Sequence, residues 1–169
     1  ILALLLVVSY PNSAKFWSKN PLLQLLFAFS TLIPFIAGVL RLRLEHYTHD
    51  PYHGLFLLLY VFVLVWAADS GAYFSGRAFG KRKLAPKVSP GKSWEGVVGG
   101  LITALVLAFV FIHFSGDALV GERNITGFVI LSVATVAISV LGDLTESMFK
   151  RESGVKDSSQ LIPGHGGVL

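Results

Sequence analysis

Four long apolar runs dominate the pattern of hydrophobic and polar positions along the chain. They cover residues 22–40, 55–74, 97–114 and 125–142, and polar, Gly or Pro residues bound each of them. A helix needs about 20 mostly apolar residues to cross roughly 30 Å of hydrocarbon. A further apolar stretch over residues 1–10 is too short to span and predicts part of another span. We therefore expect an all-α fold, a polytopic bundle of transmembrane helices.

Composition supports a membrane protein. Apolar residues make up 53% of the 169 residues and charged residues only 14%, whereas a soluble domain carries about 25% charged residues. The mean hydropathy is +0.66, and the absence of Cys excludes disulfides and thiol ligands. We expect one membrane-embedded domain over residues 1–169. Because the chain opens without Met inside an apolar stretch, we also expect it to be a fragment.

The distribution of Lys and Arg predicts the orientation of the bundle. Segments 11–20, 77–92 and 150–169 hold eleven of the 14 basic residues, and segments 41–54 and 115–124 hold the other three. With the spans above, the first group falls on one side of the membrane and the second group on the other. The positive-inside rule makes the first side cytoplasmic. The polar loops on that side are therefore expected to carry the active site.

A first polar constellation lies between the second and third apolar runs. Asp69 lies in an apolar run, where a charge costs about 2.5–3.5 kcal/mol at mid-membrane, so we expect it to face a wet cavity. Ser89 is expected to cap a helix that has Pro90 at its first position. Lys92 and Ser93 would then lie in the first turn, where free N–H groups favour an anion. An ordinary capped helix with a solvated lysine is the alternative.

Gly96 and Gly100, four residues apart, predict close helix packing.

A second polar constellation follows the last apolar run. If the helix from Ile125 continues past the membrane, it places an acid, a hydroxyl and two cations on one face, namely Asp143, Ser147, Lys150 and Arg151. A carboxylate suits Mg²⁺, and the cations suit phosphate oxygens. An ion pair between Glu146 and Lys150 is the structural alternative. His165, between glycines in a turn, is either an ordinary loop residue or part of this site.

The segment SMFKRESGVKDSSQLIPGHGG resembles the pattern of the CDP-diacylglycerol synthase (phosphatidate cytidylyltransferase) family. That pattern has a Ser, a Lys-Arg pair, a Lys-Asp pair and a Pro-x-His-Gly-Gly segment at fixed spacing. The matching positions are Ser147, Lys150, Arg151, Lys156, Asp157, Ser159, Ile162, Pro163, His165, Gly166 and Gly167. ADSGAYFSGRAFGKRKLAPKVSPGKSWEG and LGDLTESMFKRE also resemble the bacterial members. The resemblance covers residues 67–169; residues 1–66 agree only as hydrophobic spans.

The resemblance implies a reaction in which CTP and phosphatidic acid give CDP-diacylglycerol and pyrophosphate with Mg²⁺. It implies that Asp143 holds the metal, with Asp69 as a weaker candidate for metal or cytidine. Lys150 and Arg151 would contact triphosphate or phosphatidate oxygens. Further contacts to the substrates are expected from Ser147, Ser89, Lys92, Ser93, Lys156 and Asp157, with His165, Gly166 and Gly167 shaping the loop. The implied location is the bacterial inner membrane, with the active site facing the cytoplasm.

The expected partners are CTP, phosphatidic acid and the lipid bilayer, with no nucleic acid; a homodimer and a second, monovalent cation stay open. One alternative is a CTP-dependent lipid kinase of the polyprenol or phytol type. Another is a non-enzymatic lipid or anion transporter. The family pattern continues with Asp-Arg-x-Asp, where an acid resembles a second metal ligand, but this chain stops at Leu169. We therefore expect residues 1–169 alone to be inactive.

Overall fold

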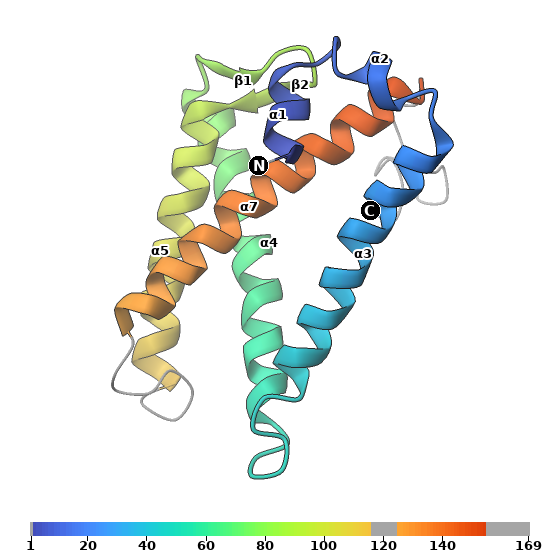
Figure 1. Ribbon diagram of the computed structural model, residues 1–169. Coiled ribbons are helices and arrows are strands. Elements are labelled where there is room, and N and C mark those ends of the chain that lie inside the picture. Colours follow the sequence, from blue (N-terminus) through green and yellow to red (C-terminus); the bar gives the residue numbers. More distant parts are fainter. Residues whose placement is uncertain (1, 116–124, 155–169) are drawn as a thin grey trace, which may run out of the picture.

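The structure, a computed structural model, describes residues 2–115 and 125–154 of the chain. This part is mostly helical, with one two-stranded antiparallel sheet near one end (Figure 1). The elements in chain order are α1 (Leu2–Val8), α2 (Ala14–Trp17), α3 (Pro21–Arg43), α4 (His53–Phe79), β1 (Lys83–Ala85), β2 (Ser89–Ser93), α5 (Trp94–Ser115) and α7 (Ile125–Glu152).

Four helices in the described part, α3, α4, α5 and α7, are long and apolar enough to cross a membrane. They match the four apolar runs, so the prediction of an all-α polytopic membrane protein is confirmed. Two helices continue beyond the predicted spans, α4 to Phe79 and α7 to Glu152. Because α7 does not break where its apolar run stops, one continuous helix carries residues 143–151 beyond that run.

The helices α4 and α5 approach each other closely along a line of small residues. A Cβ atom added at Gly96 would lie 2.9 Å from the carbonyl oxygen of Ala72, and one added at Gly100 would lie 3.0 Å from that of Ala68. These distances leave no room for a side chain, as in other membrane helix pairs that pack through small residues. The predicted packing role of Gly96 and Gly100 is confirmed.

Two hydrophobic clusters join α7 to the rest of the molecule. The first joins it to α4 and α5, and its buried members are Tyr60, Leu64, Ala68, Ala104 and Val136. Beside it, the hydroxyl groups of Tyr60 and Ser132 form a buried hydrogen bond of 2.7 Å. The second cluster joins α7 to the N-terminal segment and the β-hairpin through Val7, Ala14, Trp17, Val88, Leu144 and Met148. The two clusters fix α7 at separate points along its length.

Strands β1 and β2 form a hairpin where the start of a helix was predicted, so the prediction that Ser89 caps a helix is wrong. The strands pair antiparallel, with Lys83 opposite Ser93 and Ala85 opposite Ser89. A residue that precedes proline is disfavoured in helical conformation and favoured in extended conformation, which explains why Ser89 before Pro90 lies in a strand. The helix begins five residues later, at Trp94.

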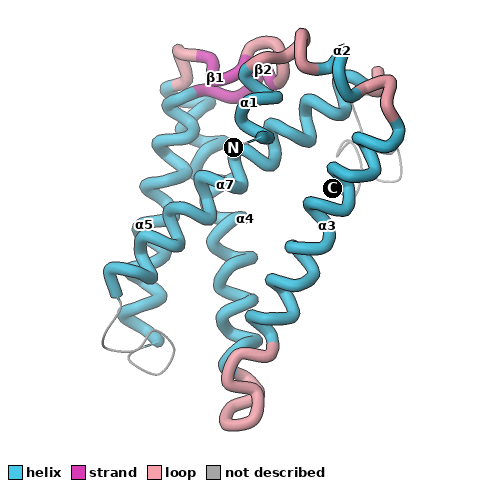
Figure 2. Tube along the Cα trace, in the orientation of Figure 1, coloured by secondary structure: helices cyan, strands magenta, loops and turns pink. Residues whose placement is uncertain are grey.

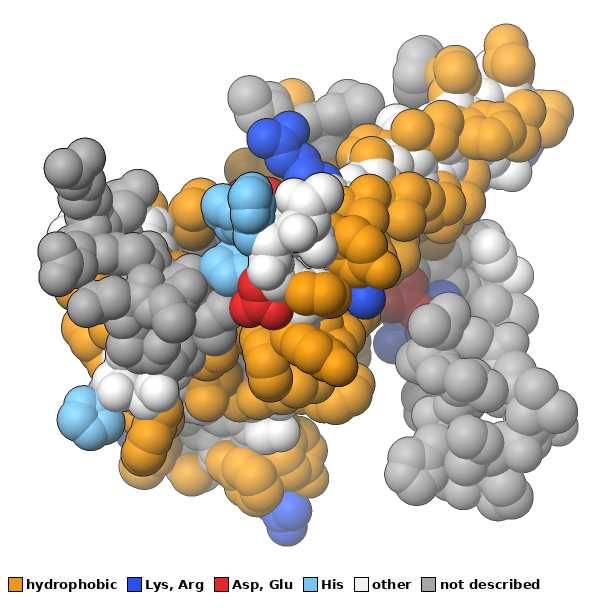
Figure 3. Space-filling model, turned by 90° about the horizontal axis from the view of Figure 1, so that it is seen from below, with side chains coloured by type: hydrophobic (Ala, Val, Ile, Leu, Met, Phe, Trp, Pro, Cys, Tyr) orange, Lys and Arg blue, Asp and Glu red, His pale blue; other side chains and the backbone are white. Residues whose placement is uncertain are grey.

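Polar segments gather at the two ends of the bundle. The hairpin, α2 and the C-terminal end of α7 lie at one end, and the loop between α3 and α4 lies at the opposite end (Figures 1 and 2). Segments 11–20 and 77–92 and the start of segment 150–169 therefore share an end, as the charge pattern predicts. Seen from the opposite end, hydrophobic side chains predominate, with a few histidines and charged groups among them (Figure 3).

The helix α3 stands apart from the other spans. Asn20 caps it by accepting hydrogen bonds from the N–H groups of Leu22 and Leu23, with Pro21 at the first helical position. None of its residues is buried in the structure. It leaves α4 at the loop and diverges toward α2 (Figure 1). The two helices come close at Gly54 of α4, where an added Cβ atom would overlap the backbone of Leu42 and Arg43.

Replacing Gly100 by Leu should destabilise the protein, because the side chain would separate α4 from α5. Overpacking of this kind costs about 1–3 kcal/mol. The matched control is Gly38→Leu on α3, where an added Cβ atom meets nothing within 4 Å. Thermal unfolding in detergent should show a lower Tm for Gly100→Leu and an unchanged Tm for Gly38→Leu. Equal Tm values for the two variants would contradict the close α4–α5 contact.

Candidate functional site

A pocket of about 550 Å³ lies between α4, α5, α7 and strand β2. It is near the end of the bundle that carries the hairpin. Charged, hydroxyl and small side chains form its wall. The lining residues are Asp69, Ala72, Tyr73, Gly76, Arg77, Ser89, Gly91, Lys92, Ser93, Gly96, Val97, Val140 and Asp143.

The wall on α4 follows the helical repeat. Asp69, Tyr73, Gly76 and Arg77 are spaced at i, i+4, i+7 and i+8, which places them on one face of a helix. Asp69 faces the cavity, as expected for an ionisable group within a span. Gly76 leaves space on this face and brings the backbone of α4 close to Ser93, whose Oγ would lie 3.2 Å from an added Cβ atom.

The hairpin that presents Ser89 and Lys92 is fixed to α5. The carboxylate of Glu95 accepts a hydrogen bond from the backbone N–H of Arg82, at 3.2 Å to each oxygen. The N–H of Trp94 donates to the carbonyl of Arg82 at 2.9 Å. The buried side chain of Val88 fixes the hairpin to the α7 cluster as well. The hairpin is therefore a supported wall of the pocket, attached on two sides.

Ser93 performs the capping role that had been assigned to Ser89. Its hydroxyl accepts a hydrogen bond of 3.1 Å from the N–H of Gly96, three residues later, which is the geometry of an N-cap. The residue is only 4% exposed. Although Ser93 lines the pocket, its hydroxyl is already engaged by the first turn of α5. The phosphate contact predicted for Ser93 stays a prediction, and this structure gives the residue a structural role.

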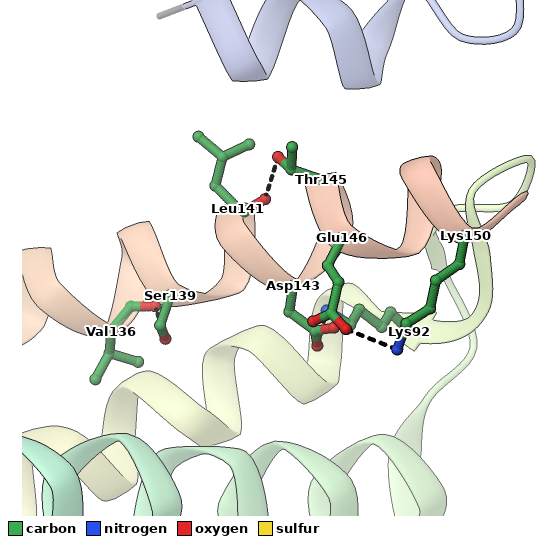
Figure 4. Close-up of polar contacts among 8 residues, drawn as sticks. All are labelled: Lys92, Val136, Ser139, Leu141, Asp143, Thr145, Glu146 and Lys150. Carbon is green, nitrogen blue, oxygen red and sulfur yellow. Dashed lines mark hydrogen bonds and ion pairs between the residues drawn. The ribbon is translucent and has the colours of Figure 1, made fainter. Parts of the chain in front are cut away.

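Lys92 and Asp143 form an ion pair across the pocket (Figure 4). Lys92 comes from β2 and Asp143 from α7, and their side chains are 25% and 55% exposed. Asp69, on α4, lines the same pocket. The pocket thus combines two acids and a lysine from three separate elements. Asp143, the predicted metal ligand, and Lys92, a predicted phosphate contact, are therefore adjacent.

These groups suit a divalent metal that arrives with a phosphate ligand. In the described part of the chain there is no group of three or more His, Asp or Glu residues that could enclose a metal ion. Mg²⁺ usually takes one or two carboxylates and completes its octahedron with water and substrate phosphates. Asp69 and Asp143 in one pocket fit that requirement. A cage made only of protein ligands does not fit.

The remaining predicted residues lie along α7 or beyond it. Lys150 forms an ion pair of 2.6 Å with Glu146. The ion pair predicted from the sequence as the structural alternative for these two residues is therefore present. Asp143, Glu146 and Lys150 project from the same side of α7, toward Lys92 (Figure 4). Ser147, Lys150 and Arg151 do not line the pocket as the described residues form it. Five predicted residues lie outside the described residues: Lys156, Asp157, His165, Gly166 and Gly167.

Sequence reasoning missed Tyr73 and Arg77, both of which line the pocket. The guanidinium of Arg77 donates a hydrogen bond of 3.3 Å from Nη1 to the hydroxyl of Tyr73, one turn earlier on α4. Arg77 had been counted only as a member of the basic segment 77–92, without a role of its own. The helical spacing from Asp69 could have identified it, because the same i, i+8 rule was applied to Asp143 and Arg151.

The fold and pocket define an integral membrane protein with a polar, two-acid site at one end of its helix bundle. The whole chain, residues 1–169, matches the model of the cytidylyltransferase family. It is 94% identical over 168 residues to a phosphatidate cytidylyltransferase of Haemophilus influenzae and 46% identical over 185 residues to one of Pseudomonas aeruginosa. The chain therefore belongs to the cytidylyltransferase family.

Coverage differs between the chain and these relatives. The alignments include 99% of this chain but 58% of the length of each of the two proteins. A Bacillus subtilis phosphatidate cytidylyltransferase is 47% identical over 120 residues, which is 69% of this chain and 42% of that protein. This chain therefore corresponds to part of each of these longer relatives.

The ion pair between Lys92 and Asp143 should contribute little to stability, because both side chains are partly exposed. Pairs of this kind contribute about 0–1 kcal/mol. A double-mutant cycle of Lys92→Gln and Asp143→Asn, followed by unfolding in detergent, should give a coupling energy below about 1 kcal/mol. A coupling near 3 kcal/mol is typical of a buried structural pair and would contradict the interpretation of these residues as ligand-binding groups.

Two matched serine variants can distinguish the N-cap residue, Ser93, from Ser89, whose hydroxyl is not used as a cap. Ser93→Ala removes a buried N-cap and should lower the free energy of unfolding by about 1 kcal/mol. Ser89→Ala removes a partly exposed hydroxyl and should change it by less than about 0.5 kcal/mol. Unfolding curves of both variants test the assignment. If Ser89→Ala proves the more destabilising change, then the helix is capped as the sequence first suggested.

Proposed function

We propose that the protein containing this chain transfers the cytidylyl group of CTP to phosphatidic acid, which gives CDP-diacylglycerol and pyrophosphate. Family membership supports a cytidylyl transfer, and the relatives named phosphatidate cytidylyltransferase suggest the lipid acceptor. The structural observation that carries the proposal is the meeting of Asp69, Asp143 and Lys92 in one pocket. Such a set can bind a magnesium–triphosphate complex at the edge of a membrane.

The reaction requires that two anions be brought together. An oxygen of the lipid phosphate attacks the α-phosphorus of CTP, the bond between that phosphorus and the oxygen bridging to the β-phosphorus breaks, and pyrophosphate leaves. Mg²⁺, when bound, supplies positive charge that offsets the repulsion and stabilises the leaving group. Asp143 and Asp69 would hold it. The transfer needs no covalent intermediate on the protein.

The ion pair offers a way to receive the nucleotide without leaving charges unpaired. Asp143 would hold the metal that accompanies the triphosphate, and Lys92 would contact a phosphate oxygen. Each group would then have an opposite charge beside it in place of its present partner. Ser89 lies at the same wall and would donate a hydrogen bond to the phosphates. Lys150 would join them after leaving Glu146.

The polar end of the bundle would face the cytoplasm of a bacterial cell, with the spans in the inner membrane. Most basic residues of the chain gather at this end, which the positive-inside rule places on the cytoplasmic side. CTP is a cytoplasmic nucleotide and would reach the pocket from that side. Phosphatidic acid would reach it from the adjoining leaflet. The site therefore lies where a water-soluble and a lipid substrate can meet.

A product assay tests the proposal on the full-length protein that contains this chain. With labelled CTP, Mg²⁺ and phosphatidic acid in detergent, CDP-lipid and pyrophosphate should form. Asp143→Asn should lower kcat/KM by about a hundredfold or more, because it removes charge stabilisation at the reacting phosphates. Removal of divalent metal by EDTA should abolish the product, and added Mg²⁺ should restore it.

The control is Glu45→Gln, which removes one acid from the loop between α3 and α4 at the opposite end and should leave the rate unchanged. Phosphorylated lipid and CDP, formed from a polyprenol acceptor, would move the protein to the lipid kinases. Absence of turnover with either lipid, together with movement of lipid or anion across vesicles, would support a transporter.

A further inference from the structure

Arg77 differs from the other cations near the pocket. Lys92 pairs with Asp143 and Lys150 pairs with Glu146, whereas in the described part of the chain no carboxylate forms an ion pair with Arg77. Its contact is the hydrogen bond to the neutral hydroxyl of Tyr73. That bond orients the guanidinium without neutralising it. Arg77 is therefore a positioned cation at the pocket that has charge available for an anion.

The surface of α4 next to Arg77 is an exposed aromatic stripe, which consists of Phe62, Trp66 and Tyr73. Counted along a helix of 3.6 residues per turn, these residues, Asp69 and Arg77 fall on one face, with Asp69 between Trp66 and Tyr73. Their exposed fractions are 42%, 66% and 59%. The rings of Phe62 and Trp66 lie 6.3 Å apart. Within a membrane span, an exposed apolar face of this kind contacts lipid chains.

Tyr73 belongs to the aromatic stripe and also lines the polar pocket. The pocket and the lipid-facing side of α4 therefore meet at Tyr73 and Arg77. Trp66 precedes Arg77 by eleven residues, which is about 16 Å along a helix. One leaflet of the hydrocarbon core is about 15 Å deep. An acyl chain whose phosphate is at Arg77 would reach the depth of Trp66.

We propose that Arg77, oriented by Tyr73, binds the phosphate of the lipid substrate, while an acyl chain of that lipid lies along the aromatic stripe. The identity of this lipid as a substrate rests on the function proposed above. A phosphate monoester at the end of a lipid is a compact dianion, and a guanidinium can bind two of its oxygens in parallel. Lys92 and Asp143 occupy the other side of the pocket, where the nucleotide phosphates bind. The two substrates thus enter from different sides.

Fluorescence quenching tests this proposal without turnover. Bromine atoms at mid-chain quench a tryptophan that they contact. The full-length protein is placed in phosphatidylcholine vesicles that contain a small, equal fraction of dibrominated phosphatidic acid or dibrominated phosphatidylcholine. Subtraction of the Trp66→Phe variant isolates the signal of Trp66. We expect phosphatidic acid to quench Trp66 more strongly than phosphatidylcholine does.

Arg77→Gln should weaken the apparent affinity for brominated phosphatidic acid roughly tenfold or more, the effect of losing hydrogen bonds to a charged group. Arg77→Lys keeps the positive charge but loses the parallel N–H donors of the guanidinium. Its affinity for brominated phosphatidic acid should lie between those of Arg77→Gln and the wild type. Lys87→Gln is the matched control, because it removes one positive charge from the exposed hairpin turn at the same end. Binding of CTP with Mg²⁺ should stay close to wild type in Arg77→Gln.

The proposal fails if the preference for phosphatidic acid survives in Arg77→Gln or is absent from the wild type. It also fails if Arg77→Gln weakens CTP binding and leaves lipid quenching intact, since Arg77 would then belong to the nucleotide. Quenching that depends on Arg77, in a protein that makes no CDP-lipid, would uphold the lipid site and refute the proposed reaction. Formation of CDP-lipid without this quenching would uphold the proposed reaction and refute the lipid site at Arg77.

Discussion

The close contact between α4 and α5 is the constraint on which the rest of the site depends. At Gly96 and Gly100 the two backbones approach without intervening side chains, and this approach fixes two walls of the pocket relative to each other. The hairpin is the connection between the same two helices, so its position follows from theirs. Glu95 then fixes the hairpin to the first turn of α5. A network of charges needs a rigid frame, because small displacements of charged groups change their interaction strongly.

The third wall, α7, is held in a different way. Two hydrophobic clusters attach it, one within the bundle and one against the N-terminal segment and Val88. The ion pair to Lys92 is partly exposed and adds little to this attachment. The attachment of α7 therefore depends on apolar contacts. Leu144 and Met148, one and five residues beyond Asp143, belong to the second of these clusters.

Much of this architecture could be predicted from the sequence, and the errors have local causes. Long apolar runs identify spans because hydrocarbon depth sets their length, but they do not report where a helix ends in water, as α7 shows. Ser-Pro is compatible with both a helix start and an extended strand. The contacts that accompany the hairpin, namely strand pairing and the hydrogen bond from the backbone of Arg82 to Glu95, are not visible in the local sequence. Asp69 was recognisable because a charge in a span is costly. Arg77 was not, because it was considered only as part of the basic segment 77–92. The pairing of Lys92 with Asp143 joins distant segments that no local rule connects.

The order of the elements along the chain also has a consequence for biosynthesis. The helices α4 and α5 and the hairpin between them are contiguous, so they can pack as soon as they leave the ribosome and enter the bilayer. Asp143 is synthesised about 50 residues after Lys92, which is several seconds later at about 5–20 residues per second. During that interval the growing chain has Lys92 but lacks the acid that pairs with it, and the N-terminal cluster lacks Leu144 and Met148. Insertion of α7 then completes both at once, so the ion pair of Lys92 with Asp143 and the N-terminal cluster form in the same step.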